Sequence, residues 1–227
     1  MKIRAVKIRA MAAPGLAFLL AVGVAPAQDA KADPVITFHF ERPGTQLPTY
    51  TFTVHEDGTG TYVAKYPAGV LSASDESVNE PLAITKGTAA KLFTEVRGTH
   101  QLRGGCASKA KNIADTGTKT LTYSELEDSA KCTWNYSEDK TIVALGDMFM
   151  GMAYTLDMGR KLATKQRFDR LGLDQEMGFL VDAVKSGHAV ELSNIAPTLR
   201  SLADDASLME RVRTRAAKLL EQSSLGK

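Results

Sequence analysis

The sequence predicts an α+β fold: a small antiparallel β-sheet with one helix, followed by an all-helical C-terminal region. Up to residue 137 the apolar residues alternate in short runs that turn residues interrupt, which is typical of antiparallel strands. From residue 141 onward they recur every three or four residues, which is typical of amphipathic helices. We therefore divide the mature chain into a β-rich region, 28–137, held by a disulfide, and a helical region, 138–227.

The first residues, 1–27, have the composition of a secretory signal peptide. Their basic residues are Lys2, Arg4, Lys7 and Arg9. A short apolar run follows, and Ala25-Pro26-Ala27 matches an A-x-A cleavage site. We therefore expect export, and a periplasmic or extracellular protein after cleavage near Ala27. The apolar run is short for a membrane span, and no later segment approaches that length; an uncleaved anchor is the alternative.

Removal of this segment changes the net charge. It holds four of the 28 basic residues and none of the 26 acidic ones, so the mature chain has 24 basic against 26 acidic residues. Its net charge is then −2, whereas the full chain has +2. Such a balance gives no global basic surface for nucleic acid or anionic membranes. We predict no nucleic-acid partner and no transmembrane segment in the mature chain.

Alternating runs identify the strands. The predicted strands span 35–41, 49–55, 61–66, 118–124 and 131–136, with a short edge strand at 81–84. Asp57-Gly58 between two such runs predicts a hairpin. A two-residue turn pairs Val54 with Thr61, whereas a three-residue turn pairs it with Tyr62. We favour the second register because it aligns aromatic side chains across the strands.

Helical periodicity and capping residues place the helices. The helix of the β-rich region is expected from an N-cap at Thr88 to about Val96. A long helix is expected from Thr141 to about Phe168, and its glycines indicate close approach of another element. Three shorter helices follow, with N-caps predicted at Asp174, at Ser193 or Asn194, and at Asp204 or Asp205.

The two cysteines lie where the strand pattern gives way to the helical one. Two cysteines in an exported chain are most simply paired, so Cys106 and Cys132 are predicted to form a disulfide. Closing a loop of about 26 residues stabilises a fold by roughly 3 kcal/mol in the chain-entropy model. Free thiols or half of a metal site are the alternatives. A metal site needs more ligands than these cysteines and scattered histidines offer, so no metal is predicted.

The titratable residues form no recognisable catalytic motif. No G-x-S-x-G, H-E-x-x-H, Walker or dinucleotide pattern is present, so no cofactor is predicted and catalytic residues stay unassigned. With His39 opposite about Thr51, His39 and His55 lie about 13 Å apart, which is too far to share a metal. If the chain is an enzyme, His39, His55 and Glu56 are the best candidates for an acid/base pair.

Three segments resemble those of uncharacterised exported bacterial proteins. They are the strand–Asp57-Gly58-Thr59-Gly60–strand unit, Cys106 to Cys132 with the following Thr133-Trp134-Asn135-Tyr136-Ser137, and the helix start Leu171-Gly172-Leu173-Asp174. The resemblance covers most of the mature chain. It implies a location in the cell envelope and no particular activity.

Together these observations favour a non-enzymatic binding or accessory module of the cell envelope, with an envelope protein as partner. Arg211, Arg215 and Lys218 line one side of the last predicted helix. Such a stripe can contact an acidic partner, although a solvated face is its default role. A secreted hydrolase whose acid/base pair comes from residues distant in sequence is the alternative. A structural envelope protein that self-associates is a third class.

Overall fold

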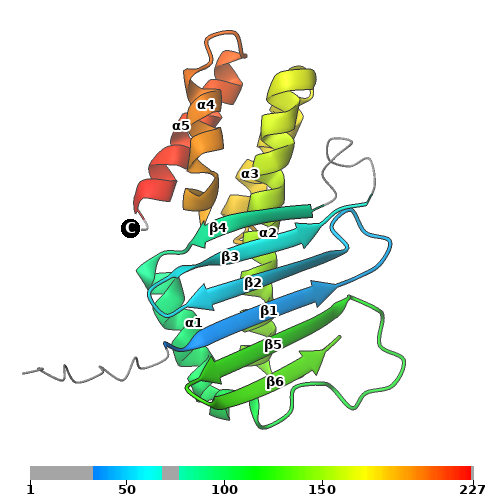
Figure 1. Cartoon of the computed structure of the whole chain (residues 1–227). Helices are drawn as coiled ribbons and strands as arrows, with labels where there is room; N and C mark the ends of the chain where they lie inside the picture. Colours follow the sequence, from blue (N-terminus) through cyan, green and yellow to red (C-terminus); the bar gives the residue numbers. More distant parts are fainter. Residues whose placement is uncertain (1–32, 68–76, 226–227) are drawn as a thin grey trace, which may run out of the picture. The chain divides into compact units, whose positions relative to one another are not determined.

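The structure is a computed structural model that describes residues 33–67 and 77–225. The expected signal peptide and its cleavage site lie outside these residues. The described chain is an α+β fold with a six-stranded antiparallel sheet and five α-helices, as predicted (Figure 1). No helix in the described ranges combines the length and hydropathy of a membrane span.

The sheet has the strand order β4-β3-β2-β1-β5-β6. The strands are β1 (Val35–Glu41), β2 (Thr49–His55), β3 (Thr59–Lys65), β4 (Ser77–Ala83), β5 (Thr118–Glu125) and β6 (Asp128–Trp134). The edge strand β4 is longer than predicted, and β6 begins earlier and ends before Tyr136, which is exposed.

The predicted register of the β2–β3 hairpin is wrong by two residues. Val54 pairs with Gly60, and Tyr62 pairs with Phe52. Gly58 has a φ of +87° and its N–H donates to the carbonyl oxygen of His55 at 3.0 Å. This left-handed glycine closes the turn early, so the strand resumes at Thr59. The expected pairing of aromatic side chains still occurs, because the rings of Phe52 and Tyr62 lie 4.7 Å apart.

The remaining elements are helical. The α-helices are α1 (Lys86–Gly98), α2 (Lys140–Phe168), α3 (Leu173–Lys185), α4 (Ala196–Asp204) and α5 (Glu210–Leu225), with 3₁₀ turns η1 (His100–Leu102) and η2 (Leu192–Ile195). The long helix α2 and the pattern of α1 agree with the prediction. The N-cap of α1 is Thr85, whose hydroxyl accepts from the Thr88 N–H at 3.2 Å, so the predicted cap at Thr88 is wrong by three residues.

The predicted caps of the three last helices are also wrong. The N-caps of α3 and α4 are Gly172 and Ile195, and neither makes a side-chain capping bond. The expected capping side chains bind elsewhere: Asp174 pairs with arginines of α5, and Asn194 Oδ1 accepts from the Ala83 N–H at 3.0 Å. Likewise, Asp205 accepts from the Ser207 N–H in the turn that precedes α5.

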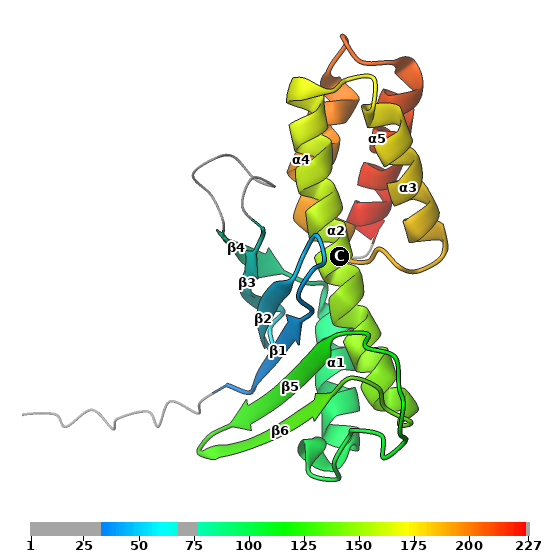
Figure 2. The ribbon, with the colours of Figure 1, turned by 90° about the vertical axis from the view of Figure 1, so that its right-hand side faces the viewer.

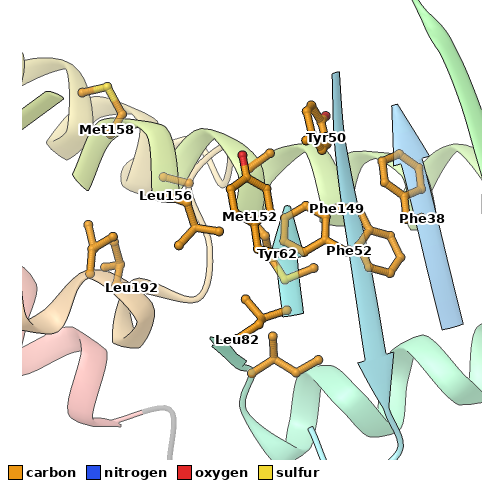
Figure 3. Packing of buried hydrophobic residues seen from close by; sticks show 14 of the residues in the cluster. Phe38, Tyr50, Phe52, Tyr62, Leu82, Phe149, Met152, Leu156, Met158 and Leu192 are labelled. Atoms are coloured by element: carbon orange, nitrogen blue, oxygen red, sulfur yellow. The ribbon is translucent and has the colours of Figure 1, made fainter. Parts of the chain in front are cut away.

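One face of the sheet carries the core. Helices α1 and α2 lie on the same side of the sheet in both views (Figures 1 and 2). Phe149 of α2 is fully buried, stacks on Phe38 with ring centres 4.7 Å apart, and its ring centre lies 5.6 Å from that of Phe52. Figure 3 shows these three side chains together in the core. The close approach expected at the glycines of α2 is present, since a Cβ on Gly146 would lie 3.2 Å from the Trp134 ring.

The opposite face of the sheet is polar. Its cross-strand neighbours include His39 and Thr51, and Thr120 and Thr133, whose hydroxyls lie 3.2 Å apart. Threonine is a common choice for the solvated face of an antiparallel sheet because its branched side chain suits the pleat. This face therefore needs no partner to explain its composition.

The β4 edge of the sheet is protected against pairing with another chain, and the β6 edge carries the disulfide. On β4, Pro81 has no N–H to offer, and the Ala83 N–H is already bound by Asn194. On β6, the predicted disulfide is confirmed: it joins Cys132 to Cys106, with Cα atoms 5.9 Å apart. The disulfide holds the chain that follows η1 beside the β6 edge.

Polar contacts join the sheet to the helical region, and the described residues group as one compact unit. Arg160 of α2 donates to Glu80 of β4 at 2.8 Å and to the Tyr66 hydroxyl at 2.9 Å. Its guanidinium also lies 5.2 Å from the centre of the Tyr62 ring. Glu191 accepts from the Thr85 N–H at 2.9 Å, so a residue of the helical region completes the cap of α1.

Candidate functional site

A hollow of about 940 Å³ lies beside α2 and α3, and we call it the α2–α3 groove. It is lined by Asp147, Met150, Gly151, Tyr154, Phe179, Asp182, Ala183, Ser186, Gly187 and His188. Its volume is within the range of pockets that bind small molecules or short peptide segments.

The helical period and a glycine turn form this groove. Asp147, Met150 and Tyr154 are spaced three and four residues apart, so they share one face of α2. The opposite wall comes from the end of α3, where Gly187 adopts a φ of +76° and turns the chain back. Gly151 allows this turn to approach, since a Cβ there would lie 3.0 Å from the carbonyl oxygen of His188.

The floor of the groove is apolar and partly open to solvent. Phe179 is 50% exposed, although α3 has a well-buried stripe one residue away at Leu180. Met150 and Tyr154 pack against the core and are half-buried. Desolvation raises the pKa of the Tyr154 hydroxyl, which stays protonated at neutral pH. Half-exposed aromatic side chains around a hollow are typical of binding surfaces.

Two carboxylates stand at the rim. Asp182 forms a pair with Lys185 at 3.6 Å, and both side chains are more than 70% exposed. Such a pair contributes little to stability, so Asp182 can exchange its partner at small cost. Within the described ranges Asp147 makes no ion pair; its charge acts on Lys119, where it offsets part of the effect of burial on the pKa of that ammonium. The rim is therefore acidic around an apolar floor.

A second hollow of about 220 Å³ continues the groove along α2, because the two hollows share Asp147 and Met150. Trp134, the only tryptophan, lines it and is 3% exposed. The Lys119 ammonium donates to the carbonyl oxygens of Gly117 at 3.1 Å and Asn135 at 3.0 Å. Burial lowers the pKa of Lys119.

The residues that the sequence suggested for acid/base chemistry lie elsewhere. His39 is opposite Thr51, as expected, and its Nδ1 is 2.8 Å from the Thr51 hydroxyl. His55 is the last residue of β2 and lies opposite Val35, the first residue of β1. Glu56 forms an ion pair with Arg97 at 2.6 Å. None of the three lines the α2–α3 groove, and no cluster of metal-binding side chains occurs in the described part of the chain.

The basic stripe on α5 is partly engaged inside the molecule. Arg211 and Arg215 each bind Asp174 of α3, at 2.8 and 3.0 Å. Lys218 is exposed. Two of the three predicted partner-binding residues therefore pack α5 against α3, while the Arg211 side chain remains 62% exposed. Sequence reasoning missed the groove, for which the available signals were Phe179 beside the apolar stripe and the glycine turn at Gly187.

A scan against protein-family models finds no match, and a search of curated proteins finds no similar sequence. The protein is therefore characterised by its fold and its groove. It is an α+β protein whose helical region carries an apolar groove with carboxylates at its rim.

Proposed function

We propose that the mature chain is a non-enzymatic binding or accessory module of the cell envelope, and that the α2–α3 groove is its binding surface. One observation supports this most: Phe179 stays half exposed in a hollow that Met150 and Tyr154 also line. A folded monomer gains about 25 cal/mol for each Å² of apolar surface that it removes from water. Aromatic surface left open around a hollow therefore indicates a partner that covers it.

Export is part of this proposal. The Cys106–Cys132 disulfide supports it, because disulfides persist in oxidising compartments and are rare in the cytosol. The partner proposed is a protein of the same compartment that presents an apolar segment with basic residues, which matches the apolar floor and the carboxylates of Asp147 and Asp182.

Site-specific photocross-linking in the native host tests the proposal. A photoreactive phenylalanine analogue replaces Phe179 in the groove, Lys218 in the basic stripe, or Val63 on the polar face of the sheet. We expect a discrete adduct from position 179 and none from position 63. The adduct should disappear when Asp147→Lys is added, because this change reverses a rim charge without touching the core.

Two outcomes would overturn the assignment of the surface. An adduct from position 218 with none from 179 would place the binding surface on the basic stripe of α5. The absence of adducts at all three positions would argue against a binding module. Urea unfolding of each variant serves as the control that the replaced side chain has not disturbed the fold.

A further inference from the structure

The turn between α2 and α3 exposes two large apolar side chains. Phe168 is 82% and Leu171 is 87% exposed, the highest values among the large apolar residues described as exposed. We call residues 167–172 the α2–α3 tip. Exposed single apolar residues are ordinary, but two in one turn form a compact apolar projection.

Hydrogen bonds hold the tip in one conformation. The Asp169 carboxylate accepts from the Gly172 N–H at 2.9 Å and pairs with Lys165 at 2.9 Å. Arg170 donates to the Ser207 hydroxyl at 2.8 Å, so the tip is fixed to the turn between α4 and α5. A projection that is already ordered loses little conformational entropy when it binds.

The charges at the tip are opposite to those at the groove. Arg167 and Arg170 flank Phe168 and Leu171, and Lys165 balances the charge of Asp169. At the groove, Lys185 pairs with Asp182 only through an exposed contact of 3.6 Å, which an incoming arginine can replace at small cost. The rim of the groove presents Asp147 and Asp182 around an apolar floor. Two arginines beside two apolar side chains therefore complement two carboxylates beside an apolar hollow.

The tip cannot fill the groove of its own chain. Tyr154 in the groove and Phe168 at the tip lie on the same helix, and 14 residues of helix separate them by about 21 Å. Figures 1 and 2 both show the α2–α3 turn at the end of the helical hairpin remote from the sheet. Only the tip of another molecule can reach the groove.

We propose that the α2–α3 groove binds the α2–α3 tip of a second copy of this chain, head to tail. This inference rests on the proposed function, because it names the partner of the groove. The two surfaces are different patches of one molecule, so each bound copy keeps one free tip and one free groove. Such a heterologous contact continues into a ring or an open filament.

Mixing two defective variants of the mature chain, residues 28–227, tests the proposal. The tip variant Phe168→Ser/Leu171→Ser retains the groove, and the groove variant Asp147→Lys/Phe179→Ser retains the tip. All four positions are exposed, so both variants should fold. Leu126→Ser, which removes a 64% exposed leucine from the β5–β6 turn, is the matched control.

Sedimentation velocity gives the readout. The wild type and Leu126→Ser should increase in average mass as concentration rises, whereas each defective variant should remain a monomer. A one-to-one mixture of the defective variants should form a heterodimer and stop at that size, because the mixture contains one working tip and one working groove per pair.

Several results would overturn this proposal: a wild type that stays monomeric at its highest soluble concentration, a tip variant that associates like the wild type, or a mixture without heterodimer. A wild type that stays monomeric while position 179 cross-links to another protein would refute self-association and leave the proposed function standing. Loss of both signals would refute both.

Discussion

The strands and the helical region of this chain differ in where they place their aromatic side chains. In the sheet, Phe38, Phe52 and Tyr62 are fully buried, and the outward face is built of polar residues. In the helical region, Phe168 and Phe179 remain at least half exposed. The comparison indicates that the sheet serves as a rigid scaffold, whereas the helical region provides the apolar surface available to a partner.

The largest difference in stability is expected when the same residue type is substituted at two positions of α2. Phe149→Ala should lower the free energy of unfolding by about 4 kcal/mol, because Phe149 packs between the rings of Phe38 and Phe52. Phe168→Ala, on the same helix but exposed, should change it by less than about 0.5 kcal/mol. Urea unfolding measures both; similar losses would show that the end of α2 is part of the core.

The second-largest loss of stability is expected from removal of the disulfide, which lies in the sheet region. Cys106→Ser/Cys132→Ser should cost roughly 3 kcal/mol, because it frees a segment of 26 residues in the unfolded chain. Reduction of the wild type should cause a similar loss, with the double serine variant in reductant as the control. Faster hydrogen exchange is expected in β5 and β6, with α3 to α5 unchanged.

High pH should destabilise the protein through buried tyrosines of the sheet region. Burial raises the pKa of Tyr50 and Tyr62 above the usual 10.0, and that of Tyr66 to about 12. Above pH 10 the unfolded chain therefore loses protons that the folded chain retains, so stability decreases as pH rises. The loss between pH 10 and 11 should be about 1 kcal/mol for each fully protected tyrosine. The midpoint of urea unfolding, measured as a function of pH, reports this loss of stability. The Tyr50→Phe variant should show a weaker dependence of the midpoint on pH.

The junction between the two regions should depend on one arginine. Arg160→Met should cost about 2 kcal/mol, because Glu80 and the Tyr66 hydroxyl lose their donor where the Arg160 side chain is 18% exposed. Arg103→Met breaks an ion pair with Asp128 whose arginine is 54% exposed, and should cost less than about 0.5 kcal/mol. Equal effects on thermal unfolding would contradict a special role for the junction.

The smallest effect on stability is expected in the groove itself. Phe179→Ser should leave the free energy of unfolding within about 0.5 kcal/mol of the wild type, because the side chain is half exposed. It should nevertheless weaken binding of a fluorescent apolar dye to the folded protein. Val63→Ser, a matched change on the sheet surface, should leave dye binding unaltered.

The sequence predicts the elements of this fold well because their periods follow directly from strand and helix geometry. The alternation of apolar and polar residues predicts the bounds of β1 and β2 to the residue. The 3.6-residue period predicts a start of α2 that is one residue from the observed start. Errors occur where a residue has competing partners. The residues around Asp174 predict that it caps a helix, yet in the fold its carboxylate binds Arg211 and Arg215.

The groove depends on contacts that no local pattern encodes. Phe179 lies beside the apolar stripe of α3, and only the packing of α3 against α2 shows that it lines the same hollow as Met150 and Tyr154. The basic stripe of α5 was visible in the sequence, whereas its internal partner on α3 was not. The disulfide was predictable because the chain has only two cysteines.

Oxidative footprinting of the protein in the intact envelope, compared with the purified protein, tests the central claim most directly. Hydroxyl radicals modify solvent-accessible side chains of both regions, including the half-buried Met150 and half-exposed Phe179 in the groove and the half-buried His39 on the sheet. We predict that Met150 and Phe179 are protected in the envelope while His39 is modified equally in both samples. Protection of His39 with unchanged modification of Met150 and Phe179 would show that the sheet, and not the helical region, meets the partner.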